Sequence, residues 1–589
     1  MPTNTSEKQL ENIFVSYLLD KQLFEGLNRK CLLSSFVLLF LFFQSSICCL
    51  WATPKDVNLT PWPMELTTTG GEYVFPRTLR ICTMGLNDDQ QKEVTRFATE
   101  LCRVTGLKVK WTARQRADMT VRVDDSVTDP EGYRLQVTKK GITVYASTAT
   151  GIFYALQSLR KMLPAHVAAG VPRLGERCSL PFVGINDAPR FRYRGFMLDV
   201  SRHFFTTQEI KKLLSLMALY KMNHFHWHLT DDQGWRVEIR KYPRLTTVGA
   251  VRENSWNTEL ERGSYWTGET YGPYFYTQDD IRDVVAYADS LHITVVPEVE
   301  MPGHLSAVMA AYPEFSCDPG GGHRVWTDGG ISTDVLNVAN PAAVQFACDV
   351  LTELAPLFPG ELFHVGGDET PTTAWENNEL CKKVFQEEQM TSYSQLQSRF
   401  TRQLAEHLHS LGKRICVWNE AITARGADMQ LIRSSGATVF CWNPCQDGAR
   451  KAAEAGLPAI ISNWGQDGCY YINRRACSKD FGAGRGGDNL QKMYDYLPVP
   501  DDVPAELHPH YIGVQATFWT EHVSNTDHLE HLALPRLIGM AEIGWTPQAR
   551  RSFPHFVERM KQDTAYLRLA GFRYHPQYLD YDGPEPPEN

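Results

Sequence analysis

The stretch Leu362-Phe363-His364-Val365-Gly366-Gly367-Asp368-Glu369 joins an apolar run to a pair of glycines and a pair of acids. A short apolar run that ends at glycine is typical of a buried strand followed by a turn. After Pro189 the pattern recurs, and helical segments such as Gln208–Tyr220 separate most of the runs. Eight strand–helix repeats over about 350 residues predict an α/β fold, a closed (β/α)8 TIM barrel rather than an open sheet. The other seven runs are Arg194–Val200, Met222–Leu229, Ile293–Val299, Arg414–Trp418, Thr438–Trp442, Ala459–Ser462 and Ile512–Trp519.

A smaller domain is predicted ahead of the barrel. The runs Met119–Val123, Tyr133–Val137 and Ile142–Tyr145 alternate apolar and polar residues, as half-buried strands do. The segment Gly151–Leu163 then places its apolar residues on one helical face. We therefore predict a small α+β supporting domain before the barrel. The predicted domains are residues 54–188 (α+β) and 189–589 (barrel with a short C-terminal helical extension).

Residues 1–53 are predicted to be an N-terminal stub followed by an export signal or an anchor. A short apolar core, Phe36–Phe43, follows Arg29 and Lys30 and has serines on both sides. A positive flank with a short apolar core is typical of an export signal, whereas a membrane span needs about 20 predominantly apolar residues. We therefore predict an exported protein, located in the periplasm, at the cell surface, outside the cell or in another lumenal compartment. The alternatives for the segment are cleavage near Ala52, lipidation at Cys48 or Cys49, and an uncleaved anchor helix.

The composition excludes several classes of protein. Hydrophobic residues make up 43% and charged residues 22% of the chain, which excludes wholesale disorder. The net charge of −9 argues against a nucleic-acid partner, because such proteins present a basic surface. The 14 cysteines include no C-x-x-C pair, so we predict buried free thiols together with a disulfide or two.

His224, His226 and His228 alternate along one predicted strand, a pattern that also suits a metal hydrolase. That reading needs further His or Lys ligands at later strand ends, and those ends carry Trp and acids instead. We therefore predict buried structural histidines, no metal and no cofactor.

Acidic and aromatic residues gather just after the predicted strands. In a barrel, the carboxyl ends of the strands meet at the face that carries the active site. Most strand ends carry such a residue, which indicates an active-site mouth rather than scattered surface charge. These residues are Asp231, Asp232, Glu300, His304, Asp368, Glu369, Trp418, Asn419, Glu420, Trp442, Trp519 and Glu521.

The residue types at this mouth suit a sugar. Indole faces stack on pyranose C–H groups, while carboxylates accept hydrogen bonds from hydroxyls. Glycoside cleavage also needs a carboxylic acid that protonates the leaving oxygen. The glycine pair permits a bend that aims Asp368 and Glu369 into the cup. Glu369 needs a raised pKa to stay protonated, and we predict that Asp231 and His304 tune it through a relay.

Five motifs lie in order between residues 194 and 521. They are Arg194–Phe204, His226–Asp232, Pro297–His304, His364–Glu369 and Gln515–Glu521. Together they resemble the signatures of glycoside hydrolase family 20, the β-N-acetylhexosaminidases. The preceding α+β domain resembles the domain that usually precedes the barrel in that family.

The resemblance implies an exo-acting, retaining glycosidase that removes terminal β-linked N-acetylhexosamine from a glycan. In this family the substrate's own acetamido oxygen attacks the anomeric carbon and forms an oxazolinium, an exception to the two-carboxylate rule. By motif position, Asp368 orients the acetamido group, and Glu369 is the acid and then the base. Asp231 and His304 form the relay behind Glu369. The residues implied to bind the sugar are Arg194, Glu300, Trp418, Trp442, Tyr471, Asn473, Trp519 and Glu521.

Two positions depart from the family pattern. The family often has Asp where this chain has Glu300, and Tyr-x-Asp where this chain has Tyr471-Ile472-Asn473. Asn473 keeps an acceptor but loses the charge, so contacts to the far hydroxyls, and the preference between gluco and galacto sugars, stay open. The main alternative function is a catalytically silent sugar-binding barrel. A lectin keeps the tryptophans but has no use for Glu369 backed by a relay.

Overall fold

The computed structural model describes residues 57–113, 117–259, 263–465, 468–475 and 490–575. The predicted export segment within residues 1–53 lies outside these ranges. Among the described helices, none combines the length and the apolar character needed to cross a membrane. The described cysteines form no disulfide with one another, unlike the disulfide or two predicted, and most of them are buried.

Eight parallel strands close into a barrel, which confirms the predicted (β/α)8 fold. Each predicted run supplies one strand, and the neighbours around the barrel follow the chain order, with the last strand pairing with the first. The strands are β8 (Tyr193–Asp199), β9 (His224–His228), β14 (Thr294–Glu298), β15 (Leu362–His364), β16 (Arg414–Trp418), β17 (Thr438–Cys441), β18 (Ala459–Ile461) and β19 (Tyr511–Phe518).

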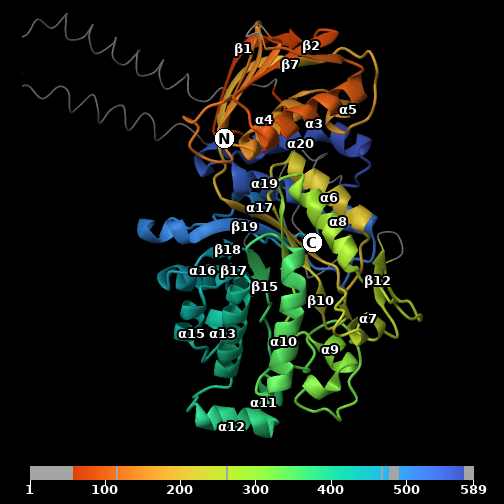
Figure 1. Cartoon of the computed structure of the whole chain (residues 1–589), viewed down its shortest axis with the longest axis vertical. Helices are drawn as coiled ribbons and strands as arrows, with labels where there is room; N and C mark the ends of the chain where they lie inside the picture. The colour runs from red at the N-terminus through yellow and green to blue at the C-terminus, as the bar shows by residue number, and fades with distance from the viewer. Residues whose placement is uncertain (1–56, 114–116, 260–262, 466–467, 476–489, 576–589) are drawn as a thin grey trace, which may run out of the picture. The chain divides into compact units, whose positions relative to one another are not determined.

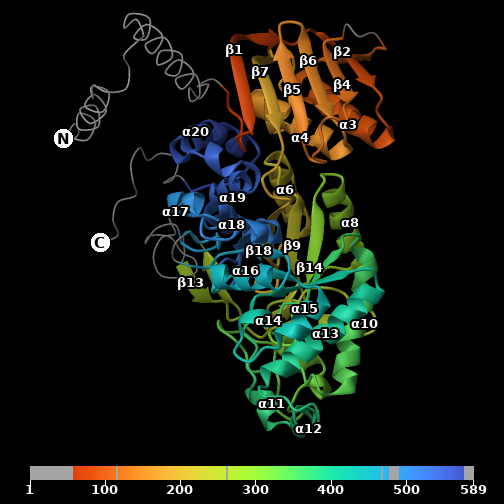
Figure 2. The same cartoon turned by 90° about the vertical axis from the view of Figure 1, so that its left-hand side faces the viewer.

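Helices cover the outside of the barrel (Figures 1 and 2). Their starts are set by local sequence: Thr206 and Glu209 form a capping box for the first helix, and Asn340 with Pro341 begins the third. Each of these helices buries an apolar stripe against the strands. The main covering helices are α6 (Thr207–Leu219), α8 (Gln278–Asp289), α10 (Pro341–Leu354), α13 (Ser394–Ser410), α16 (Cys445–Glu454) and α19 (Arg536–Trp545).

Side chains fill the inside of the barrel. Tyr193, Met197, Phe440 and Trp418 belong to a separate cluster of buried residues there. The His224 ring stacks on Tyr193 with 4.1 Å between ring centroids. The interior of the barrel is therefore a packed core. The polar residues of an active site are expected at the carboxyl ends of the strands.

The domain before the barrel is a mixed seven-stranded sheet in the order β1-β7-β5-β6-β4-β2-β3. Two helices, α3 (Asp88–Thr105) and α4 (Ala149–Met162), lie against one face of it (Figure 2). The predicted strands correspond to β4, β5 and β6 and the predicted helix to α4. The strands are β1 (Glu65–Val74), β2 (Thr78–Met84), β3 (Lys108–Trp111), β4 (Met119–Val123), β5 (Tyr133–Thr138), β6 (Gly141–Ala146) and β7 (Ser179–Asp187).

Buried ion pairs join this domain to the amino-terminal end of the barrel. The Arg194 guanidinium donates to both carboxylate oxygens of Glu131, at 2.8 and 2.9 Å. Lys221 donates to Asp187 at 3.0 Å, and all four of these side chains are largely or fully buried. A charged side chain that is buried this deeply needs a partner of opposite charge. Each ion pair takes one partner from each domain, so the two domains depend on their contact with each other.

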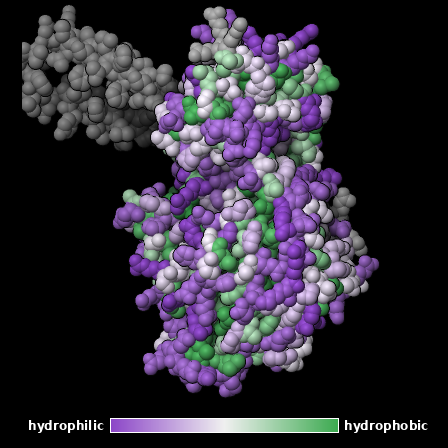
Figure 3. Space-filling view, viewed as in Figure 1, coloured by the Kyte–Doolittle hydropathy of each residue, from purple (hydrophilic) through white to green (hydrophobic). Residues whose placement is uncertain are grey.

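The face drawn in Figure 3 is mostly hydrophilic. Apolar residues on it occur in small groups between charged and polar ones. This is the ordinary surface of a globular protein.

Candidate active site

A cavity of about 410 Å³ opens at the carboxyl ends of the barrel strands. Its wall combines carboxylates, cations and indole rings, as the sequence predicts for a sugar site. The lining residues are Arg202, His304, Gly329, Gly330, Asp368, Glu369, Trp418, Trp442, Asn443, Trp464, Tyr471, Asn473, Arg474, Trp519, Glu521 and His522.

The bend that carries the acid pair needs its glycines. Gly366 and Gly367 have φ values of 69° and 93°, in the left-handed region that glycine adopts readily. Glu369 itself has φ of 47°, which is uncommon for a residue with a Cβ. A Cβ at Gly366 would lie 1.6 Å from a carboxylate oxygen of Glu300. The predicted bend is present, and the chain packs so tightly there that no side chain fits at Gly366.

Gly366→Ala should therefore abolish activity and lower the free energy of unfolding. Its cost combines about 1–2 kcal/mol for the left-handed backbone with the displacement of the buried Glu300 side chain that the new Cβ would meet. Denaturant unfolding and turnover of a chromogenic substrate measure the two effects. Gly412→Ala is the matched control, because Gly412 also has a positive φ, of 73°, but has open space around its Cβ position. Equal losses in the two variants would show that the Glu300 contact is unimportant.

Asp368 and Glu369 share one histidine. The His304 Nε2 atom lies 3.7 Å from a carboxylate oxygen of each. Burial raises the pKa of Asp368, and burial followed by the charge of Asp368 raises the pKa of Glu369. A raised pKa keeps Glu369 protonated at higher pH, which suits a proton donor.

Asp231 is buried and connects His304 to Arg202, whose side chain lines the cavity. Its carboxylate lies 3.3 Å from His304 Nδ1, 3.0 Å from His228 Nε2 and 2.8 Å from an Arg202 nitrogen. Burial alone would raise the pKa of Asp231, but Arg202 and then His304 hold it well below the usual range. Burial alone would likewise lower the pKa of His304, and the charges of Asp231 and Asp368 raise it well above its usual range. Asp231 is therefore a fixed anion between three cationic groups.

The predicted aromatic residues come together in the cavity. Trp442 stacks against Tyr471 with 6.2 Å between ring centroids and 18° between planes. Trp418 and Trp519 lie 6.1 Å apart and line the same cavity. Acidic groups hold two of the indoles, since Trp442 Nε1 donates to Glu420 and Trp418 Nε1 donates to Glu298, both at 2.8 Å. These rings are therefore fixed before any sugar binds.

Two predicted sugar-binding residues lie elsewhere. Arg194 is at the amino-terminal end of β8, fully buried, and its guanidinium is bound to Glu131 of the small domain. Glu300 is fully buried behind the glycine pair and does not line the cavity. Burial, and then the charge of Asp368, raise the pKa of Glu300 well above its usual range, and Glu300 supports the bend by accepting from the Gly367 backbone N–H at 3.3 Å. Both predictions of direct sugar contact are corrected here.

Arg202 belongs to the site and was not among the predicted site residues, whereas Glu420 was predicted at the mouth of the barrel. Arg202 lines the cavity, three residues beyond the end of β8, and lies 3.4 Å from Glu521. Its place after a strand end is the signal that identifies it, since Arg194 begins the same strand. Glu420 follows β16 and fixes Trp442, and burial together with Asp368 raises its pKa to about 8.

Substitutions of the two arginines should separate their roles. Arg202→Met should lower kcat/KM by about 10- to 100-fold through a higher KM, because a charged hydrogen-bond donor is lost from the cavity. Arg194→Met should leave KM unchanged and lower the free energy of unfolding by about 3 kcal/mol, because Glu131 loses its partner. Kinetics and denaturant unfolding of both variants measure this. A higher KM in Arg194→Met with unchanged stability would restore the original prediction.

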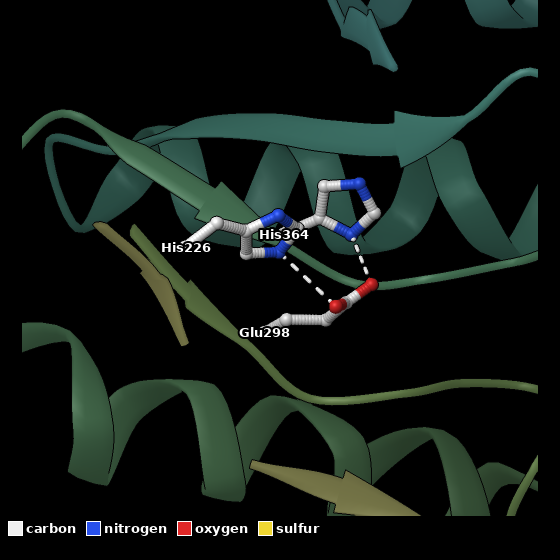
Figure 4. A group of neighbouring side chains, drawn as sticks. All are labelled: His226, Glu298 and His364. Atoms are coloured by element: carbon white, nitrogen blue, oxygen red, sulfur yellow. Dashed lines mark ion pairs between the residues drawn. The ribbon is translucent and has the colours of Figure 1, made fainter. Parts of the chain in front are cut away.

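Four groups of described side chains bring three His, Asp or Glu ligand atoms within 4.8 Å of one another. Figure 4 shows one of them, in which His226 and His364 point toward the carboxylate of Glu298. The Glu298 charge already has protein partners, because His228 lies 2.5 Å from it and Trp418 donates to it. This group is therefore an ion-pair cluster centred on Glu298.

The long segment after β9 forms part of a second cavity. The hairpin β12 (Trp256–Glu259) and β13 (Gly263–Trp266) brings Trp256 and Trp266 within 5.1 Å, measured between ring centroids. Both rings line a cavity of about 400 Å³ that shares Arg202 and Glu521 with the first cavity. A role of this segment in leaving-group preference stays a prediction.

Comparison with known families matches nearly the whole described chain. Residues 191–548 match "Glycosyl hydrolase family 20, catalytic domain", and residues 56–188 match "Glycosyl hydrolase family 20, domain 2". The chain is 35% identical over 529 residues to a β-hexosaminidase of Porphyromonas gingivalis, which covers 88% of this chain and 64% of that protein's length. It is 32% identical over 456 residues to a β-hexosaminidase of Akkermansia muciniphila, which covers 76% of this chain and 85% of that protein.

Solved structures agree. The β-N-acetylhexosaminidase of Streptomyces coelicolor A3(2) superposes with a TM-score of 0.73 at 30% identity, covering 91% of this chain and 99% of that one. A mutant Streptomyces plicatus β-hexosaminidase, solved with its product GlcNAc, superposes with a TM-score of 0.74 at 29% identity, covering 92% and 99%. The catalytic-domain match spans more than half of the chain, both domains are present in order, and the chain therefore belongs to glycosyl hydrolase family 20.

Proposed function

We propose that this protein is an exo-acting β-N-acetylhexosaminidase, which removes terminal β-linked N-acetylhexosamine with retention through an oxazolinium intermediate. Family membership and the β-hexosaminidases among its relatives support the reaction class. The acid pair in the cavity supports the mechanism. Glu369 protonates the leaving oxygen, while Asp368 orients the acetamido group and offsets the charge of the oxazolinium.

The observation that carries this proposal is a set of unsatisfied polar atoms. One oxygen each of Asp368, Asn473 and Glu521, together with His304 Nε2, is buried without a hydrogen-bond partner among the described residues. All four side chains line the same cavity. Buried polar atoms are almost always paired, so this cluster indicates a polar ligand that pairs with them. A sugar with an acetamido group supplies hydrogen-bond donors for the unpaired oxygens and acceptors for the histidine N–H.

Hydrolysis of 4-nitrophenyl N-acetyl-β-D-glucosaminide tests the proposal. We expect release of nitrophenol and, by proton NMR, the β-anomer of N-acetylglucosamine as the first product. The matching glucoside, which lacks the acetamido group, should be hydrolysed far more slowly, because its nucleophile is missing. Binding of N-acetylglucosamine without turnover would support the silent sugar-binding barrel instead. The galactosaminide, measured alongside, gives the preference between the two sugars.

We also propose that the protein is exported. The support is the pattern in residues 1–53, where a basic flank precedes a short apolar core. Cell fractionation followed by determination of the mature N-terminus distinguishes cleavage, lipidation and an uncleaved anchor.

A further inference from the structure

Glu298 is a buried anion that the proposed mechanism does not use. It ends β14, has no exposed surface and contacts side chains from β9, β15 and β16. His226 Nε2 lies 3.1 Å from one carboxylate oxygen, and His364 Nδ1 lies 2.8 Å from the other (Figure 4). An ionised carboxylate at this depth persists only if it is paired.

His228 supplies that pairing and connects Glu298 to the relay. Its Nδ1 lies 2.5 Å from Glu298, and its Nε2 lies 3.0 Å from Asp231. Each ring nitrogen therefore faces a carboxylate oxygen. A neutral imidazole has one N–H and would turn a lone pair toward an anion, so this geometry selects the imidazolium, which donates on both sides.

The contacts continue without a break to the catalytic pair. Asp231 lies 3.3 Å from His304, which in turn lies 3.7 Å from Asp368 and from Glu369. Glu298 also accepts from Trp418, whose ring lines the cavity. One buried carboxylate thus contacts both the relay and the sugar-binding wall.

We propose that Glu298 is a positioning residue for the reaction, which holds His228 as an imidazolium and thereby fixes Asp231, and which orients Trp418. This inference rests on the proposed function, since it gives Glu298 a role in the same active site. Glu298 touches neither substrate nor reacting atoms, and it acts through His228 and Trp418.

The charges around His228 decide its protonation. Burial alone would lower its pKa, but Glu298 and Asp231 raise it to about 10. The other charged or titratable groups that face it are Glu300, 3.9 Å away, Asp199 on β8, His364 on β15, and Arg202 through Asp231. Of these, Glu300 has a pKa raised by burial and by the charge of Asp368, and burial lowers the pKa of His364 to about 4. Glu298 is therefore the main counterion on the far side of the ring.

Glu298→Gln keeps the shape and removes this counterion. We expect kcat/KM for a disaccharide to fall about 10- to 100-fold, the range found when outer partners of functional groups are removed. Because His228 then loses its proton at a lower pH, its pKa should fall by at least about one pH unit, and the alkaline limb of the pH–rate profile, which Glu369 sets in the native enzyme, should move down with it. Glu298→Asp keeps the charge, so its alkaline limb should stay close to that of the native enzyme.

His226→Gln is the matched control. His226 lies in the same barrel layer and is equally buried, and its Nε2 contacts Glu298 at 3.1 Å, but among the described residues it forms no ion pair with Asp231 and is not in the relay. We expect a loss of stability without a shift of the alkaline limb. An equal shift in His226→Gln and Glu298→Gln would mean that the shift does not report the charge of Glu298 on His228, and would overturn the proposal.

Nitrogen NMR of histidine-labelled native protein supplies a readout that needs neither activity nor a variant. His228 should remain doubly protonated up to about pH 9. Titration of His228 near its ordinary pKa would overturn the proposal even if the enzyme hydrolyses its substrate. Loss of activity after dialysis against EDTA, restored by Zn²⁺, would also overturn it and make the cluster a metal site. Absence of turnover in the native protein would refute the proposed function, and the histidine titration would still report on Glu298 and His228.

Discussion

Glu369→Gln should collapse the rate on an N-acetylglucosamine disaccharide while sparing much of the first step on an activated aryl glycoside. The disaccharide's leaving oxygen needs a proton, whereas nitrophenolate leaves without one. General acid catalysis is typically worth about 10²–10⁴-fold, which sets the expected gap between the two substrates. Burial and the neighbouring Asp368 raise the pKa of Glu369, so the native enzyme keeps its proton donor toward neutral pH and loses it as the pH rises. Steady-state and burst kinetics on both substrates measure this.

The leaving-group comparison is its own control, because both substrates place the same sugar in the cavity. An equal loss on both would remove Glu369 from the role of proton donor. Glu420→Gln provides a second control, since Glu420 is also an acid of raised pKa in this region but contacts Trp442 rather than the cavity. Its effect should be similar on the two substrates.

Asp368→Asn should reduce turnover by roughly 10²–10³-fold, the scale of one preorganised contact to a charged transition state. The substitution keeps the shape of the side chain and removes the charge that opposes the developing oxazolinium. Binding of the ground-state sugar should change much less, because the positive charge appears only on the way to the intermediate. A thiazoline mimic of the oxazolinium should inhibit the native enzyme strongly and the variant weakly.

The competing mechanism makes Asp368 a covalent nucleophile, as in ordinary retaining glycosidases. A 2-fluoro sugar without the acetamido group should then leave a glycosyl adduct on Asp368. Detection of that adduct by intact mass would refute the substrate-assisted mechanism, though the protein would remain a glycosidase.

The barrel was predictable because its strands are buried on both faces and read as continuous apolar runs. The small domain was predictable only in part. Strand β1 is almost wholly exposed, and β3 is short and mostly exposed, so neither shows the alternation of a half-buried strand. Pairing with a neighbour, rather than burial, makes these segments strands, and that pairing is not written in local sequence.

The site was predictable where a residue follows a strand end. This rule places Asp368, Glu369 and Trp442 at the mouth, and the structure finds all three in one cavity. The motif resemblance led to Arg194, and only the direction of β8 shows that Arg194 lies at the opposite end from Arg202. Second-layer groups such as Glu298 were not predictable, because nothing in the local sequence separates an acid that faces the cavity from one that lies behind its wall.

The ion pairs between the domains also limit how this protein can be recombined with its relatives. A chimaera that joined this barrel to another member's small domain at residue 188 would separate Arg194 from Glu131 and Lys221 from Asp187. Lys161 of the small domain would lose Asp563, which lies on the C-terminal helix α20 (Phe553–Leu569). Crossover points that keep both members of each pair in one parent should yield soluble hybrids. A junction between the two domains should do so only when the foreign domain supplies carboxylates at the same places.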